Sequence, residues 1–207
     1  MSAEQRTRTE GNVSLTLEDQ QIPSLFQILQ QGFMVKVRLG CSVREMLCGQ
    51  LDLDPRYVDE RIKTIFFDGK PVDDIDSAII KEGSTLALSG AMPGLVGATF
   101  RRGGHLAPFR SQITYHEEGK SIDKRRGMLV LKLFNLLVTE LGPSFLEKGL
   151  WVKGDALMRF LKGRPAAFWS GCKEIKVDGR EMSAADLLKE KWLENKDLLF
   201  LKIGVSQ

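Results

Sequence analysis

The stretch of this 207-residue sequence with the clearest chemical potential lies near its midpoint, where residues 91–105 read AMPGLVGATFRRGGH. Glycines let backbone amides approach a ligand closely, and arginine guanidinium groups bind phosphate or carboxylate through paired hydrogen bonds. We therefore expect a ligand-binding loop made by Gly94, Gly97, Arg101, Arg102, Gly103, Gly104, His105 and Arg110. A P-loop ending and a GxGxxG motif are both missing, so the cofactor, if there is one, stays unknown.

Few residues have the types and spacing that catalysis needs. His105 and His116 are the only histidines in the sequence, and a proline-containing stretch separates them, so they fit neither a zinc-binding pair on one helix nor an acid/base couple. Cys41 lies at an expected helix start, yet no base is placed beside it to activate a thiol. The acidic cluster after Pro71 lacks the ligand number of a calcium loop and is interpreted as a turn. The sequence therefore predicts no catalytic residue and no metal site, and it favours a protein that is not an enzyme.

Composition limits the classes of partner. The 30 basic residues exceed the 27 acidic residues only slightly, which is too small a surplus for a partner that is a polyanion along its whole length. Residues 101–126 hold seven basic and three acidic residues, but few aromatic side chains accompany them. A solvated face is favoured there over nucleic-acid binding, so we expect a protein partner or a small anionic ligand.

Targeting signals and cysteine usage favour the cytoplasm. Residues 1–11 carry charges where a signal peptide needs an apolar core, and we expect a disordered leader there. The apolar stretch 128–138 is well short of the roughly 20 residues of a membrane span, so it predicts a core helix and no membrane association. Three cysteines without a CxxC pair are typical of a reducing compartment. The oligomeric state is left open.

The first half of the chain shows a clear order of elements. Residues 33–39 alternate between apolar and polar side chains, as a half-buried strand does. Ser42 and Glu45 form a capping box at the start of a helix. Strands at 62–67 and 84–89 follow, with Asp68 and Gly69 as a tight turn after the first of them. The order is that of the later part of a β-grasp fold.

The residues IFFDGKPVDDIDSAIIKEGSTLAL carry a resemblance to a known family. This stretch resembles ubiquitin-like β-grasp proteins, particularly the small sulfur carriers of thiamine and molybdopterin biosynthesis, and the similarity covers about residues 33–104. The resemblance implies a β-grasp fold. It also implies a role for a terminal glycine carboxylate, because such carriers work through a free carboxylate at a diglycine end, and Gly103 and Gly104 follow the last expected strand here.

The second half repeats the pattern of the first. GLWVKGDALMRFLKG parallels FMVKVRLGCSVREMLCG, CKEIKVDGREM parallels RIKTIFFDGKPV, and ENKDLLFLKIG parallels KEGSTLALSG. Upstream, a short strand and a helix in VSLTLED and IPSLFQILQQG are paralleled by a strand in SQITYHEEG, residues 111–119, and a helix from Met128 onward. We expect an α+β protein with two tandem β-grasp domains at 12–90 and 109–207, produced by internal duplication and joined by a Gly-rich loop at 91–108. Chance similarity of two short α+β segments is the alternative.

Three functions follow from this organisation. The first is a non-enzymatic binding protein whose interdomain Gly/Arg loop holds an anionic ligand or a protein partner. The second is a ubiquitin-like or sulfur-carrier precursor that a protease cuts at Gly104. The third is an enzyme with its site in the interdomain cleft. The alternative is a structural role in which Leu95, Val96 and Phe100 pack between the domains, and it is compatible with binding in the same cleft.

Overall fold

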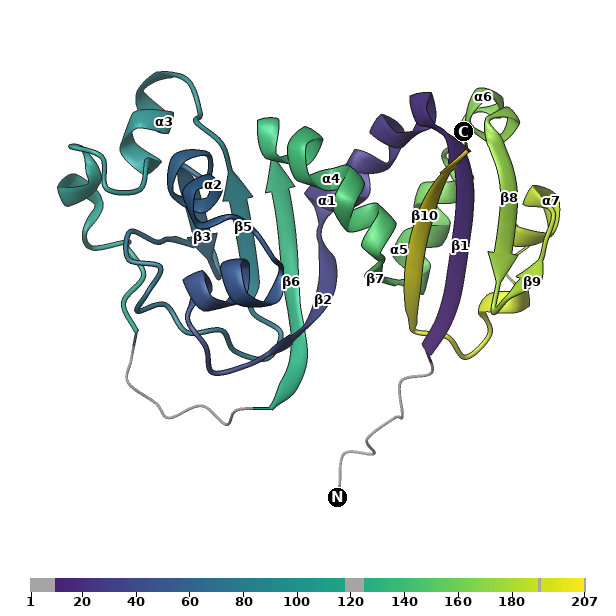
Figure 1. The fold of residues 1–207 in the computed structure, drawn as a ribbon, viewed down its shortest axis with the longest axis horizontal. Coiled ribbons are helices and arrows are strands. Elements are labelled where there is room, and N and C mark those ends of the chain that lie inside the picture. Colours follow the sequence, from purple (N-terminus) through teal and green to yellow (C-terminus); the bar gives the residue numbers. More distant parts are fainter. Residues whose placement is uncertain (1–9, 118–124, 190, 207) are drawn as a thin grey trace. The chain divides into compact units, whose positions relative to one another are not determined.

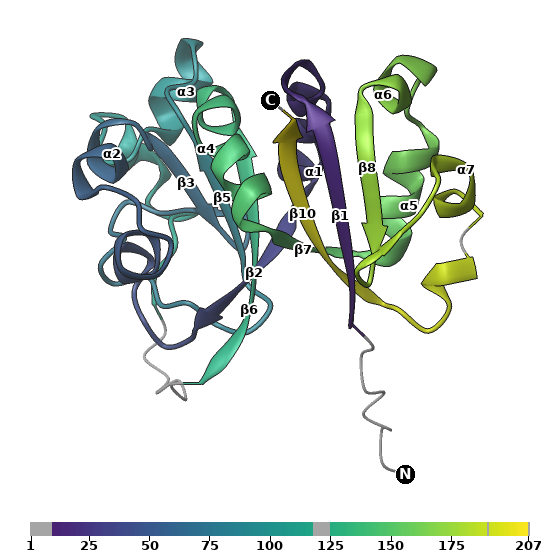
Figure 2. The same cartoon turned by 45° about the vertical axis from the view of Figure 1, so that its right-hand side comes forward.

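The protein is described by a computed structural model that covers residues 10–117, 125–189 and 191–206. It has an α+β fold that divides into two compact units, one of residues 1–28 and 143–207 and the other of residues 29–142. We call these unit 1 and unit 2. Figures 1 and 2 show the helices and strands of both.

Unit 2 contains a mixed sheet with the strand order β4-β3-β5-β6-β2. The strands are β2 (Phe33–Arg38), β3 (Thr64–Phe67), β4 (Lys70–Pro71), β5 (Thr85–Ser89) and β6 (Arg126–Phe134). β6 lies parallel to β5 and antiparallel to β2, while β3 is antiparallel to β5 and β4.

Helices complete unit 2. They are the π-helix η2 (Glu45–Gln50), α2 (Pro55–Glu60), α3 (Gly94–Phe100) and the 3₁₀ helix η3 (Ala107–Arg110). η2 and α2 lie against one face of the sheet (Figures 1 and 2), where they bury Met46, Leu47 and Val58. Two further helices, α1 (Phe26–Gln31) and α4 (Leu136–Lys148), contain the points at which the chain passes between the units.

Within unit 1 the strands pair in the order β7-β10-β1-β8-β9. Its strands are β1 (Glu10–Glu18), β7 (Leu150–Lys153), β8 (Cys172–Val177), β9 (Arg180–Glu181) and β10 (Leu198–Ser206). Its helices are η1 (Asp19–Leu25), α5 (Gly154–Lys162), α6 (Ala166–Ser170), α7 (Ala184–Leu187) and η4 (Lys191–Leu193). β1 is parallel to β10 and antiparallel to β8.

Several local predictions are confirmed. The strand at 33–39 and the cap at Ser42 are present, with the Glu45 amide donating to the Ser42 hydroxyl at 3.1 Å. The turn at Asp68 and Gly69 has positive φ at both residues, +49° and +79°, and joins β3 to β4. Such φ values suit a two-residue hairpin turn and are costly for most other residue types.

The prediction of a helix starting at Met128 is wrong, because residues 126–134 form β6. Within it Leu129, Leu131 and Leu133 are fully buried and the residues between them are less so, which is the period of a strand. The helix α4 begins only at Leu136, after Asn135 breaks the strand with a φ of +55°. The strand expected at 111–119 is also absent from residues 111–117, which form turns and irregular backbone, and its last two positions lie outside the described residues.

The division into units differs from the expected domains 12–90 and 109–207. The chain divides after residues 28 and 142, and the expected interdomain loop 91–108 lies inside unit 2. β1, inside the first expected domain, pairs with β8 and β10 of unit 1. β6 lies between β5 and β2 of unit 2 instead. The expected leader at 1–11 lies outside the described residues up to position 9, and Glu10 and Gly11 already belong to β1.

Candidate functional site

The expected binding loop lies inside unit 2 and is folded around two short helices. Residues 91–117, which we call the crest segment, contain α3, a turn at 101–106 and η3. The Arg102 amide donates to the Lys63 carbonyl at 2.7 Å, which attaches the turn to the body of unit 2. Gly104 donates to the Arg101 carbonyl at 3.1 Å, and its own carbonyl accepts from Ala107 at 2.9 Å.

Arg110 fastens the crest segment from within. Its guanidinium is only 2% exposed and lies 2.7 Å from an oxygen of Asp73. The same group donates to the carbonyl of Thr99 at 2.7 Å and to the hydroxyl of Thr114 at 2.9 Å. The guanidinium nitrogens of Arg110 therefore donate to groups inside the protein, and Arg110 is unsuited to the ligand-binding role predicted for it.

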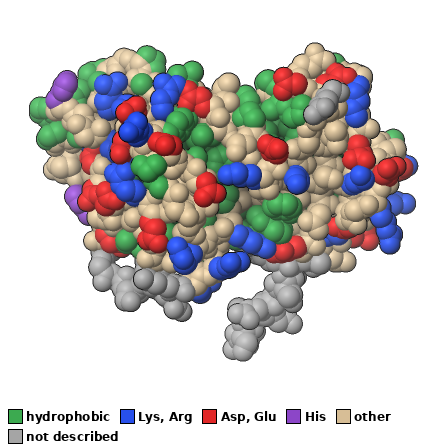
Figure 3. Space-filling model, in the orientation of Figure 1, with side chains coloured by type: hydrophobic (Ala, Val, Ile, Leu, Met, Phe, Trp, Pro, Cys, Tyr) green, Lys and Arg blue, Asp and Glu red, His purple; other side chains and the backbone are tan. Residues whose placement is uncertain are grey.

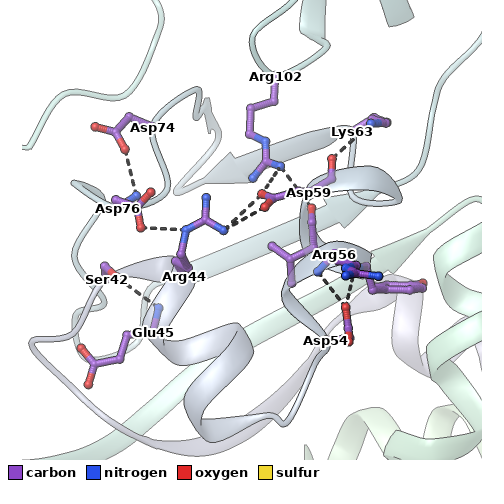
Figure 4. A network of polar contacts seen from close by, with 12 residues as sticks. Ser42, Arg44, Glu45, Asp54, Arg56, Asp59, Lys63, Asp74, Asp76 and Arg102 are labelled. Atoms are coloured by element: carbon purple, nitrogen blue, oxygen red, sulfur yellow. Dashed lines mark hydrogen bonds and ion pairs between the residues drawn. The ribbon is translucent and has the colours of Figure 1, made fainter.

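Arg102 also turns inward, into the polar network of Figure 4. Its guanidinium donates to the Val58 carbonyl at 3.1 Å and to Asp59 at 3.3 Å. Asp59 accepts from Arg44 as well, which in turn contacts Asp76 at 2.8 Å. Burial lowers the pKa of Arg102, and one guanidinium nitrogen, Nη1, is buried with no hydrogen-bond partner in the described part of the protein. The network holds the turn in place.

Four of the eight predicted site residues surround one pocket. It has a volume of about 330 Å³, and Gly94, Arg101, Gly104 and His105 line it together with Met92, Pro93 and Ala98. Arg101 and His105 are both exposed. We call this the Arg101 pocket.

The glycines of the segment have structural duties. Gly97 is the buried residue of α3, and a Cβ there would overlap the carbonyl of Met92. Gly94 and Gly103 have φ values of +74° and +63°. These three positions need glycine for packing or backbone conformation, whether or not a ligand binds.

A second pocket of about 670 Å³ lies on another side of the Gly103–Gly104 turn. Carboxylates contribute to its wall, among them Asp73, Asp74 and Glu117. Glu117 accepts from the Tyr115 hydroxyl at 2.6 Å and from Lys81 at 2.9 Å. This pocket was hard to predict from the sequence, because its residues are spread over positions 73–117.

The crest segment exposes large apolar side chains. Leu95 and Val96 on α3 are 75% and 65% exposed, Phe109 on η3 is 85% exposed, and Ile113 is 52% exposed. α3 and η3 are in contact. We call these four side chains the apolar patch, and Figure 3 shows hydrophobic side chains gathered near a histidine at the end of unit 2 where α3 lies.

The packing role predicted for Leu95 and Val96 is therefore wrong. α3 buries its small residue, Gly97, and turns large residues outward, which reverses the usual amphipathic pattern. Phe100 does pack, with its ring centroid 5.2 Å from that of Phe66. The small residues of GLVGA are the feature of the sequence that could have indicated a helix whose small face is buried and whose large apolar face is exposed.

No activated nucleophile emerges among the described residues. All three cysteines are unpaired, and burial raises the pKa of Cys41, Cys48 and Cys172 above the ordinary thiol value. A raised pKa keeps a thiol protonated and unreactive. No group of His, Cys, Asp and Glu side chains suited to a metal ion occurs in the described ranges. Within the same ranges, none of the helices has the length and apolar character of a membrane span.

The chain matches no protein-family model, no curated protein and no solved structure.

Proposed function

We propose that this protein is a non-enzymatic binding module that holds a protein partner on the apolar patch. The observation that carries the proposal is the exposure of Leu95, Val96 and Phe109, each at least 65% accessible, on a segment that a buried ion pair fixes in place. Exposed apolar side chains gathered on one segment mark interaction surfaces. A fixed surface also loses little conformational entropy when it binds.

A small anionic ligand is the weaker version of this proposal. It relied on Arg101, Arg102 and Arg110 acting together, but Asp59 and Asp73 already neutralise the last two. One exposed arginine beside four exposed apolar side chains is suited to a protein surface, where apolar contacts supply most of the affinity.

The fold supports two β-grasp-like domains, with one complication. Read from β2 and from β7, the strands of both units pair antiparallel, parallel, antiparallel and antiparallel. The Asp178–Gly179 turn between β8 and β9 has the same φ values, +49° and +79°, as its counterpart between β3 and β4. However, the strand next to the edge differs. In sequence β10 aligns with β5, but β10 is the neighbour of β7, the counterpart of β2, whereas β5 is the neighbour of β3. The proposed duplication therefore includes an exchange of the two central strands.

Processing at Gly104 finds less support. Carrier chemistry needs an extended tail. Here the Gly103 amide donates to Asp73 at 3.1 Å, and both the amide and the carbonyl of Gly104 form backbone hydrogen bonds. A cut there would also separate β6 from the strands β2 and β5 that it joins. For the third function, an enzyme with its site in the interdomain cleft, we assign no catalytic residue.

Selection from a display library of random 16-residue peptides tests the proposal. The bait is the full chain, and the comparison variant is Leu95→Ser with Phe109→Ser. The matched control is Leu136→Ser with Val205→Ser, which replaces two side chains of 58% and 52% exposure outside the crest segment. We expect peptides that bind the wild type and the control but not the patch variant. Peptides that bind all three proteins equally, or no enriched peptides at all, would overturn the proposal.

A further inference from the structure

The charges on the crest segment are mostly compensated by ion pairs with the rest of unit 2. Its one acidic residue, Glu117, stands at its end and pairs with Lys81 at 2.9 Å. Two of the segment's arginines are neutralised by carboxylates from elsewhere in unit 2, Arg102 by Asp59 and Arg110 by Asp73. Arg101 is exposed and has no carboxylate partner among the described residues. The uncompensated arginine of the crest segment, Arg101, therefore puts a positive charge on the side of the apolar patch where Leu95 lies.

The Arg101 pocket adjoins the apolar patch directly. Gly94 lines the pocket, and the next residue, Leu95, is the first member of the patch. Arg101 and His105 line the same pocket, and a guanidinium binds a carboxylate better than it binds a neutral group. A volume of about 330 Å³ can accept a single acidic side chain.

From this juxtaposition we infer that the partner is a protein segment in which an acidic side chain stands beside large apolar ones. The carboxylate enters the Arg101 pocket, and the apolar side chains cover Leu95, Val96 and Phe109. This inference rests on the proposed function and adds the chemistry of the partner to it.

A polyanion fits the same surface less well. Nucleic acids and anionic membranes bind through many cations at once. In the described part of the crest segment only Arg101 is an uncompensated arginine, and beyond the Gly103–Gly104 turn the second pocket has Asp74 and Glu117 in its wall. A chain of phosphates that crossed this turn would be repelled by the carboxylates of Asp74 and Glu117. A single acidic side chain bound in the Arg101 pocket does not extend to them.

Fluorescence anisotropy with the enriched peptides tests the inference. Each labelled peptide is titrated with the wild type, with Arg101→Gln, and with Arg56→Gln as a control for an exposed arginine on α2. We expect Asp or Glu beside apolar residues in the peptides, and an affinity about tenfold weaker for Arg101→Gln, since a charged hydrogen bond is lost. The control should stay within about twofold of the wild type, and added salt should weaken only wild-type and control binding.

A second arm isolates the carboxylate. Replacing the acidic residue of the peptide by its amide should weaken binding to the wild type about tenfold and leave binding to Arg101→Gln unchanged, because both changes remove the same contact. The inference is overturned if the amide peptide binds the wild type as well as the acid does, or if vesicles of phosphatidylserine bind while peptides do not. Loss of binding in the Leu95→Ser, Phe109→Ser variant with no effect of Arg101→Gln would leave the proposed function standing and remove only the acidic partner.

Discussion

Arg110 donates from Nη2 to Oδ1 of Asp73 across 2.7 Å, with its own side chain almost completely buried. The two residues are 37 positions apart in sequence and join the crest segment to the loop after β4. The Gly103 amide donates to the same oxygen atom of Asp73 at 3.1 Å. One carboxylate thus fixes both the turn at 101–106, through Gly103, and η3, through Arg110.

Asp73→Asn should destabilise the protein strongly, because it leaves the buried guanidinium without a counter-charge. Breaking a buried ion pair costs about 3 kcal/mol or more in the free energy of unfolding. The control is Asp155→Asn, which removes the partner of Arg159 in an exposed pair and should cost about 0.5 kcal/mol. Urea denaturation followed by circular dichroism measures both. Equal costs for the two variants would mean that Arg110 does not fasten the crest segment.

Gly97→Ala should dislodge α3. The added methyl group overlaps the carbonyl of Met92, and we expect a loss of about 1–3 kcal/mol in the free energy of unfolding, the usual range for overpacking. Peptide binding to the patch should weaken along with it. Gly49→Ala is the matched control, since its Cβ would meet nothing closer than 3.9 Å and its stability should be equal to or above that of the wild type. Unchanged stability and binding in Gly97→Ala would contradict the placement of α3.

Two leucines five positions apart distinguish the strand β6 from the expected helix. Leu131 is fully buried in the sheet and Leu136 is 58% exposed at the start of α4. Leu131→Ala should cost about 2–5 kcal/mol in the free energy of unfolding, and Leu136→Ala about 0.5 kcal/mol or less. Thermal unfolding of the two variants gives the comparison. A larger cost at Leu136 than at Leu131 would exclude this register.

Glu140 should make part of the stability sensitive to acid. Hydrogen bonds from Arg61 and then from Tyr57 hold the pKa of this carboxyl below its usual value. A lowered pKa in the folded state contributes stability that is present above the unfolded pKa of about 4.3 and is lost as the pH falls through the folded value. Glu140→Gln should therefore reduce the loss of stability between neutral pH and pH 3. Arg61→Gln, which removes the first of the two donors, should act in the same direction. Urea denaturation at several pH values measures the effect. If neither variant changes the loss of stability below neutral pH, Glu140 is not the acid-sensitive group.

Local patterns made part of the fold predictable. The alternation of 33–39, the cap at Ser42 and the Asp68–Gly69 turn depend on neighbouring residues, and each appears in the structure as expected. β6 escaped prediction because its partners β2 and β5 lie far away in sequence, and a run of apolar residues is compatible with a helix or with a strand buried between two others.

The candidate site was predictable in position but not in detail. Gly94, Arg101, Gly104 and His105 do share a pocket. The sequence could not separate Arg101 from Arg102, because their roles depend on Asp59, more than 40 positions earlier in the chain. The sequence analysis did not predict the apolar patch, because apolar residues are usually expected to be buried.

Hydrogen–deuterium exchange of the full chain, with and without the tightest enriched peptide, tests the docking surface most directly. We predict slower exchange in fragments that cover residues 94–113 when the peptide is bound, and unchanged exchange in fragments from residues 150–189. We also predict that this protection disappears in the Leu95→Ser, Phe109→Ser variant. Protection confined to other parts of the chain, with residues 94–113 unaffected, would show that the crest segment does not hold the partner.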